Sequence, residues 1–170
     1  MVEKSGFAAG ADYIEGIEEF FVAVQRVNLI EIERAPQLRS RALGFDARSF
    51  DPLGKGYGPL FNYLDTLQST VVRVAAGQFT REAIAVVKNR QFIEFCEHAG
   101  DRETAAMYRD VIEPDERYHH ELGRMLLLRL AITPEAQAAA AAAARKTLEL
   151  ADELQRKALA TAGIHHAPGC

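Results

Sequence analysis

Several features that define other protein classes are absent from this sequence. It has no tryptophan and only two cysteines, Cys96 and Cys170. Two widely separated cysteines are too few for a disulfide framework or a zinc knuckle, and they fit a reducing compartment. No apolar run reaches the roughly eighteen residues that span a membrane. The segment Met1 to Asp12 also lacks a basic region followed by a sustained apolar stretch, so we expect a cytoplasmic protein with no membrane partner.

Charge of one sign is not concentrated anywhere in the chain. The 20 Lys and Arg residues are spread among 24 Asp and Glu residues, and no basic block is longer than Arg39-Ser40-Arg41. Without a cationic stripe, nucleic acid is not an expected partner. The 170 residues are 48% hydrophobic and 26% charged, which is typical of a globular protein. We expect one domain over residues 1–163 and a flexible tail over residues 164–170.

Apolar residues recur at helical steps of three and four along most of the chain. Helix-ending and helix-capping residues interrupt this pattern at Pro36, Gly100-Asp101 and Thr133-Pro134-Glu135. The expected helices are Asp12 to Ala35, Leu60 to Ala99, 102 to about Ala131, and 134 to about Thr161. A long irregular connection, Pro36 to Pro59, could cross from one end of a bundle to the other. The predicted fold is all-α, an antiparallel bundle of four or five helices.

Two points of this outline have alternatives. The segment Gly77 to Thr80 either bends one continuous helix, which we prefer, or divides Leu60 to Ala99 into two, with Thr80 as N-cap. Pro114 either kinks the third helix or marks its true boundary, and we prefer the kink because the apolar period continues across it. The alanine run over residues 138–144 indicates close packing or simple helix propensity.

The stretch Glu116-Arg117-Tyr118-His119 places a carboxylate and an imidazole three residues apart, on one face of a helix, where both can reach one metal ion. This pair lies along the apolar seam of its helix. In the preceding helix Glu82 interrupts an apolar series with helical spacing, where an aliphatic side chain belongs. In the first helix Glu31 shares a face with apolar residues. These four residues are the candidate metal ligands.

The turn at Gly100-Asp101 determines how far along the two helices three of these candidate ligands lie. Glu82 lies 18 residues before Gly100, and His119 lies 18 residues after Asp101. At about 1.5 Å per residue, both are about 27 Å from the turn, so an antiparallel pair of helices would bring them together. Buried carboxylates are costly without positive charge, and a divalent iron or manganese ion would supply it.

Each candidate also has a purely structural interpretation. Glu116 and His119 could be a hydrogen-bonded pair, and Glu82 could form a salt bridge with Arg117 or Arg124. Glu31 stands near a helix end, which is usually wet. The neighbours of His119, His120 and Glu121, point elsewhere on the helix and are expected at the surface. His98 suits the helix C-terminus near which it lies.

The segment from Glu82 to Ala131 resembles the last helical pair of the ferritin-like di-iron proteins, with rubrerythrins and bacterial tRNA hydroxylases as the nearest patterns. The matching residues are Ala99-Gly100-Asp101, Tyr108-Arg109, Asp115-Glu116-Arg117-Tyr118-His119 and Leu126-Leu127. The family's site uses four carboxylates and two histidines from two Glu helices and two Glu-x-x-His helices. This chain carries one Glu-x-x-His unit, and neither Glu31-Ile32-Glu33-Arg34 nor Asp65-Thr66-Leu67-Gln68 supplies a second.

The resemblance implies a metal-binding ferritin-like protein with one or two iron ions, or manganese. It further implies an oxygen- or peroxide-dependent oxidoreductase in which Glu82, Glu116 and His119 hold the metal and Glu31 completes the shell. The sequence does not indicate the small-molecule substrate. The alternative is a non-catalytic ferritin-like scaffold with a degenerate metal site, which acts as a binding or assembly module through an apolar helix face and forms a homodimer.

Overall fold

The computed structural model describes residues 38–39, 41–44, 58–163 and 165–168. The chain divides into two compact units, residues 1–47 and 48–170. In the first unit, residues 38–39 and 41–42 are helical and residues 43–44 form a turn. The predicted helix Asp12 to Ala35, and Glu31 within it, lie outside the described residues, as does most of the predicted connection Pro36 to Pro59. The single domain over residues 1–163 therefore stays a prediction.

In the second unit all described secondary structure is helical. The elements in order are α2 Pro59–Thr66, α3 Thr70–Val74, the π-helical η2 Ala75–Arg81, α4 Glu82–His98, α5 Arg102–Met107, the π-helical η3 Tyr108–Ile112, α6 Glu113–Leu130 and α7 Pro134–Ala162. No strand occurs in the described ranges, which confirms the all-α prediction. None of the described helices has both the length and the apolar character needed to cross a membrane.

The helix boundaries after residue 98 follow the predicted punctuation. The side chain of Asp101 accepts a hydrogen bond from the Thr104 backbone N–H at 3.1 Å, so it caps α5. Thr133 caps α7 in the same way, accepting from the Ala136 N–H at 3.2 Å. Gly100 adopts φ +81°, a left-handed conformation that glycine takes without a Cβ clash and that suits the reversal between α4 and α5.

The prediction of one continuous helix from Leu60 to Ala99 is wrong for the first part of this range. The chain leaves the helix at Leu67, whose ψ is 123°, and re-enters it after Ser69, so α2 is separate. Beyond that point the preference for continuity is confirmed, because the helix runs through Gly77 as the π-helical η2. Pro114 is no boundary either, since Ile112 and Glu113 both keep right-handed helical angles. The η3 segment widens the backbone just before this proline, which cannot donate a backbone hydrogen bond.

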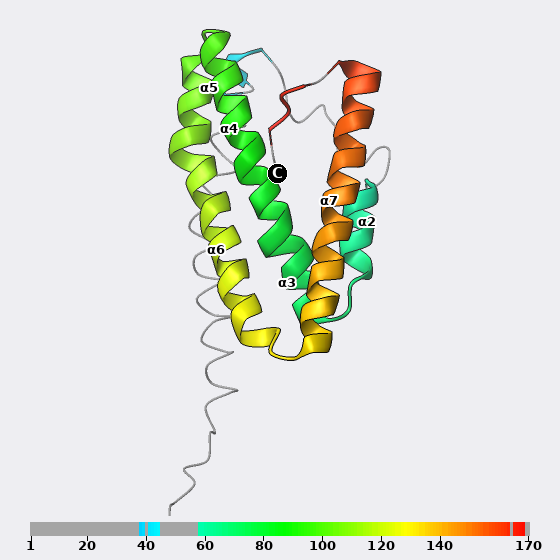
Figure 1. The fold of residues 1–170 in the computed structure, drawn as a ribbon. Helices are drawn as coiled ribbons and strands as arrows, with labels where there is room; N and C mark the ends of the chain where they lie inside the picture. The colour runs from blue at the N-terminus through cyan, green and yellow to red at the C-terminus, as the bar shows by residue number, and fades with distance from the viewer. Residues whose placement is uncertain (1–37, 40, 45–57, 164, 169–170) are drawn as a thin grey trace, which may run out of the picture. The chain divides into compact units, whose positions relative to one another are not determined.

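The rod formed by α3, η2 and α4 lies between α6 and α7, and both of these helices contact η2 (Figure 1). On the α7 side, Ala75 and Ala76 pack with Ala140 and Ala143 in a buried cluster. Small side chains at this contact let the two backbones approach closely. The alanine run at residues 138–144 therefore contributes to close packing as well as to helix propensity.

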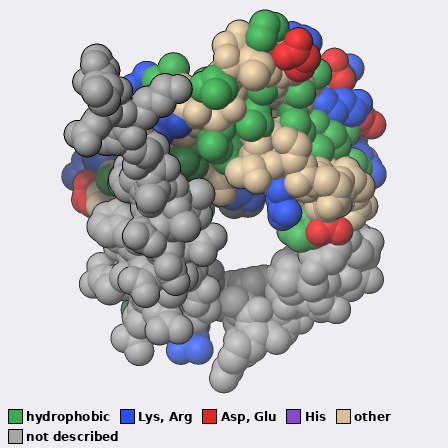
Figure 2. Space-filling model, turned by 90° about the horizontal axis from the view of Figure 1, so that it is seen from below, with side chains coloured by type: hydrophobic (Ala, Val, Ile, Leu, Met, Phe, Trp, Pro, Cys, Tyr) green, Lys and Arg blue, Asp and Glu red, His purple; other side chains and the backbone are tan. Residues whose placement is uncertain are grey.

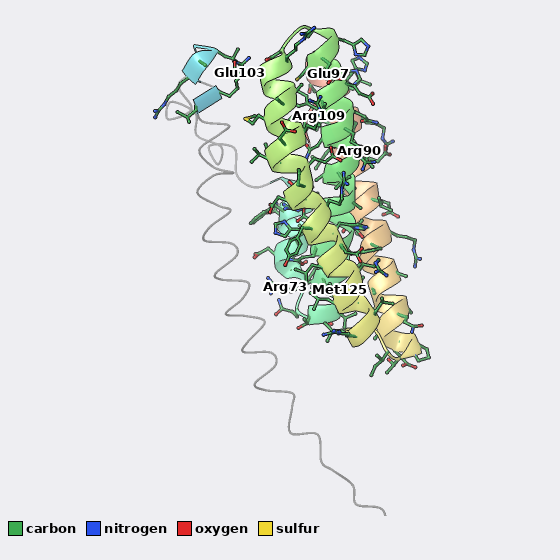
Figure 3. The ribbon with its side chains drawn as sticks, turned by 90° about the vertical axis from the view of Figure 1, so that its left-hand side faces the viewer. Arg73, Arg90, Glu97, Glu103, Arg109 and Met125 are labelled. Carbon is green, nitrogen blue, oxygen red and sulfur yellow. The ribbon has the colours of Figure 1, made fainter. Side chains whose placement is uncertain are left out.

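The α4–α6 hairpin has its own core and a row of ion pairs. Ile93, Cys96 and Ala105 are buried near the turn. Along the seam, Arg109 of η3 forms an ion pair with Glu97 of α4 (Figure 3). Ala105 and Arg109 belong to one arm, and Ile93, Cys96 and Glu97 belong to the other, so these contacts hold the hairpin together near its turn.

Glu113, the first residue of α6, accepts from two arginines. Its Oε1 lies 2.9 Å from Arg90 Nε and 2.6 Å from Arg117 Nη2. Burial alone would raise the pKa of Glu113. The hydrogen bonds and charges of Arg90 and Arg117 outweigh burial and hold this pKa below its ordinary value of 4.5. The Glu113 carboxylate is therefore a stabilising ion-pair partner, in contrast to the carboxylate of Glu116, one turn further along α6.

Candidate metal centre

Glu82, Glu116 and His119 converge in the second unit. One ligand atom from each lies within 4.8 Å of the others. Glu82 begins α4, while Glu116 and His119 lie one turn apart on α6. The prediction that the two arms bring these residues to one level is confirmed. Their separation is small enough for one ion to contact all three side chains.

Both arms of the hairpin carry a π-helical segment immediately before the site. The η2 segment ends at Arg81, directly ahead of Glu82, and η3 ends at Ile112, four residues ahead of Glu116. A π segment inserts extra backbone into a helix and so rotates the residues after it relative to those before it. Such segments are frequent at functional sites. No pattern in the sequence indicated either segment.

Glu82 is almost fully buried, with 6% of its surface exposed. Its Oε1 accepts a hydrogen bond from Arg81 Nη2 at 3.0 Å. Its Oε2 is buried and accepts no hydrogen bond from a backbone N–H, a hydroxyl group or a basic side chain in the described part of the chain. A buried carboxylate oxygen without a donor is costly, so this atom needs a proton or a cation.

The predicted alternative for Glu82, a salt bridge to Arg117 or Arg124, is wrong. Arg117 pairs with Glu113, and Arg124 pairs with Glu121, each at 2.6 Å. Glu82 instead forms an ion pair with the adjacent residue, Arg81.

Glu116 lies against Glu82, and its pKa reflects this. Burial, then a hydrogen bond shared with Glu82, then the negative charge of Glu82 raise the pKa of Glu116 from 4.5 to about 8, while Arg81 acts in the opposite direction. Glu116 therefore holds a proton at neutral pH, which it can share with Glu82. A divalent cation at the same place would replace this proton and relieve the repulsion between the two carboxylates.

Asp115 is a neighbour of the site that sequence reasoning did not single out. Its Oδ2 lies 3.5 Å from His119 Nδ1. Metal-binding histidines typically direct one ring N–H at a carboxylate, which fixes the ring and leaves the other nitrogen for the ion. With Nδ1 facing Asp115, the nitrogen left for a metal is Nε2. The i, i+4 spacing of Asp115 and His119 was the available signal in the sequence.

The expectation of a surface position is wrong for His120 and confirmed for Glu121. His120 Nδ1 lies 2.7 Å from the Phe79 carbonyl oxygen, and the two rings stack with centroids 4.9 Å apart. His120 therefore ties α6 to the π-helical η2. Glu121 is exposed and pairs with Arg124. No pattern in the sequence indicated the His120 contact, because it depends on the path of η2.

Gly123, one turn after His119, allows α6 to approach η2. A Cβ at this position would lie 2.6 Å from both the Gln78 carbonyl carbon and the Phe79 nitrogen. Real carbon contacts are about 3.5–4.0 Å, so only glycine fits without movement of the backbone. The spacing of the two arms, and with it the spacing of Glu82 from Glu116 and His119, depends on this contact.

The donor set fits a divalent transition-metal ion. Two carboxylates and an imidazole offer oxygen and nitrogen ligands, which suit iron, manganese or zinc better than a soft thiolate-preferring ion. In the described ranges these three residues form the one group of His, Cys and acidic side chains close enough to share an ion. Glu31, the fourth predicted ligand, lies outside the described residues.

Comparisons with family models, with curated proteins and with solved structures gave no match.

Proposed function

We propose that this protein binds a divalent transition-metal ion through Glu82, Glu116 and His119. The observation that carries the proposal is their convergence within 4.8 Å around a buried carboxylate oxygen of Glu82 that has no ordinary donor among the described residues. The raised pKa of Glu116 supports it, because a proton occupies the place that a cation would take. The contact between Asp115 and His119 supports it independently.

Iron is the first choice of metal and manganese the second, because carboxylate and imidazole ligands suit both. Three protein ligands leave coordination positions open, and iron held in this way supplies oxygen- or peroxide-dependent oxidation. We therefore propose a non-haem iron oxidoreductase on a ferritin-like bundle. The resemblance of the Glu82 to Ala131 segment supports this reaction class. In this proposal the protein orients the site: Arg81 holds Glu82, and Asp115 holds His119.

The test is the metal content of full-length protein that carries no histidine tag, measured by elemental analysis after expression in iron-supplemented medium. About one iron per chain is expected. The variants Glu116→Gln and His119→Ala should each remove it. Glu121→Gln and His98→Ala are the matched controls, because they change exposed residues of the same two types on α6 and α4.

Wild-type protein without bound metal, before and after reconstitution with ferrous iron, would overturn the proposal. So would metal that persists in both Glu116→Gln and His119→Ala. Oxidoreductase activity is tested separately, by oxygen or peroxide consumption of the iron-loaded protein. Iron binding without any such consumption would contradict the reaction class while leaving metal binding in place.

A second candidate function, a binding or assembly module, is favoured by exposed apolar side chains at the end of α6. Leu128 is 68% exposed, and Ile132, in the α6–α7 turn, is 74% exposed. Hydrophobic side chains are also visible among charged ones on the described part of the lower end (Figure 2). Self-association through this surface would be lost in a Leu128→Glu, Ile132→Glu variant, measured by sedimentation velocity. A monomeric wild-type protein would contradict a homodimer formed in this way.

A further inference from the structure

A cavity of about 320 Å³ lies between α4 and α7. Its walls are two helix faces with the same spacing, together with Leu60 of α2 and two residues near the C-terminus. One consists of Arg81, Ile84, Ala85 and Lys88, and the other of Ala151, Leu154, Gln155 and Ala158. Positions i, i+3, i+4 and i+7 form one stripe of a helix, so the two stripes face each other across the cavity.

The described residues 165–168 border this cavity. Ala167 and Pro168 line it, and His166 stacks on Phe95 of α4 with ring centroids 5.4 Å apart. In Figure 1 the described part of this segment runs back between the upper ends of α4 and α7. The volume falls at the lower end of the range for small-molecule sites, about 300–1,000 Å³.

The polar groups of the cavity have one sign of charge. Eight of its eleven lining residues are apolar, and the other three are Arg81, Lys88 and Gln155. No acidic side chain is among these described lining residues. Lys88 Nζ donates to the Gln155 side-chain oxygen, a partner that carries no charge. Apolar walls with two cations are complementary to an organic anion.

A neighbouring cavity differs from this one in the charge of its lining residues. It shares Ile84, Lys88, Ala151 and Gln155, but Asp152 also lines it. Asp152 forms an ion pair with Arg156 at 2.9 Å and adds negative charge on that side of Lys88. An anion is therefore favoured in the first cavity, between Lys88 and Arg81.

We infer that this cavity binds a small organic carboxylate with an apolar body, such as a medium-chain fatty acid. The carboxylate pairs with Lys88 and Arg81, and the apolar body lies against Ile84, Leu154 and Ala158. An inorganic phosphate or sulfate ion would leave these walls unfilled. Two cationic side chains in an otherwise apolar cavity favour a ligand that carries one negative group on an apolar body.

Arg81 connects this cavity to the proposed metal centre. In the described ranges its guanidinium forms one ion pair, with Glu82, and its remaining donors can reach a ligand. A cation bound at Glu82 would take over the neutralisation of that carboxylate and free Arg81 for the ligand. The link through a metal-bound Glu82 rests on the proposed function, whereas the binding of the carboxylate in the cavity does not.

The test is a calorimetric titration of full-length, metal-free protein with octanoate, with octanamide and octylamine as neutral and cationic analogues. We expect saturable octanoate binding, at least about tenfold tighter than binding of either analogue. Lys88→Met should weaken octanoate binding about tenfold. Lys157→Met, which removes an exposed lysine of α7, should not change it. Ala158→Leu, which fills the cavity, should also weaken binding, and circular dichroism verifies that each variant is folded.

Equal affinity for octanoate and octylamine would overturn the inference, as would unchanged binding in folded Lys88→Met and Ala158→Leu variants. Absence of octanoate binding by the wild-type protein would overturn it too. Because the titration uses metal-free protein, these outcomes are independent of whether Glu82, Glu116 and His119 bind iron. Repeating the titration after manganese loading measures the link through Arg81, and tighter octanoate binding is expected.

Discussion

Replacing Gly123 with alanine should destabilise the protein, although alanine is the better helix former. The added Cβ would stand 2.6 Å from the Gln78 carbonyl carbon and 2.6 Å from the Phe79 nitrogen. Both atoms belong to the backbone of η2, so no side chain can rotate away. To restore an ordinary carbon contact, α6 and η2 must separate by about 1 Å.

The magnitude follows from two opposing effects. Overpacking of a well-packed contact costs about 1–3 kcal/mol, and a backbone collision belongs at the upper end of this range. Alanine recovers up to about 1 kcal/mol of helix propensity relative to glycine. The free energy of unfolding should therefore fall by about 2 kcal/mol. Metal affinity should fall as well, because the same movement separates Glu82 from Glu116 and His119.

Gly77→Ala is the matched control, because it lies in η2 and its added Cβ would have no neighbouring atom within 4 Å. This change should leave stability unaltered or raise it by up to about 1 kcal/mol. Urea unfolding followed by far-UV circular dichroism measures both variants. If Gly123→Ala proves as stable as Gly77→Ala, the close approach of α6 to η2 is not as described, and the reasoning fails.

Three further predictions concern single side chains. Asp115→Asn should weaken metal binding by about 10–100-fold in a manganese titration, because Asp115 orients His119; equal affinity would exclude this role. Glu113→Gln should lower the free energy of unfolding by about 1 kcal/mol at pH 7. Since the folded-state pKa of Glu113 is below 4.5, this difference should be present above pH 4.5 and should disappear as the pH falls through the lower value; a gap that persists in acid would argue against the ion pairs. Thr147→Val should raise stability by about 1 kcal/mol in urea, because the Thr147 hydroxyl is fully buried without a described partner, and a loss of stability would indicate a hidden one.

Local signals in the sequence were sufficient to predict the helix ends and the position of the site along its two helices. Asp101 and Thr133 act through hydrogen bonds to residues three positions away, so the sequence contains both partners. The meeting of Glu82 with His119 followed from the turn at residues 100–101 and an average rise per residue, although the second arm includes the π-helical η3. These predictions succeeded because helical geometry propagates regularly from a well-defined turn.

The features that escaped prediction depend on contacts between distant segments. Leu67 to Ser69 contains neither glycine nor proline, so the end of α2 had no local marker. The path of η2 is coupled to the missing side chain of Gly123 and to His120, more than forty residues later in the chain. The role of Arg81 had no signal in the sequence, because it comes from burial of the adjacent Glu82.

The central claim, that Glu82, Glu116 and His119 bind one ion, is tested most directly by electron paramagnetic resonance of Mn²⁺ titrated into tag-free, metal-free protein. The signal of free Mn²⁺ should stay suppressed until about one equivalent per chain has been added. In Glu116→Gln it should rise from the first addition, while Glu121→Gln should behave as the wild-type protein does. A free-ion signal that rises from the first addition in the wild-type protein, or equal suppression in Glu116→Gln, would contradict the claim.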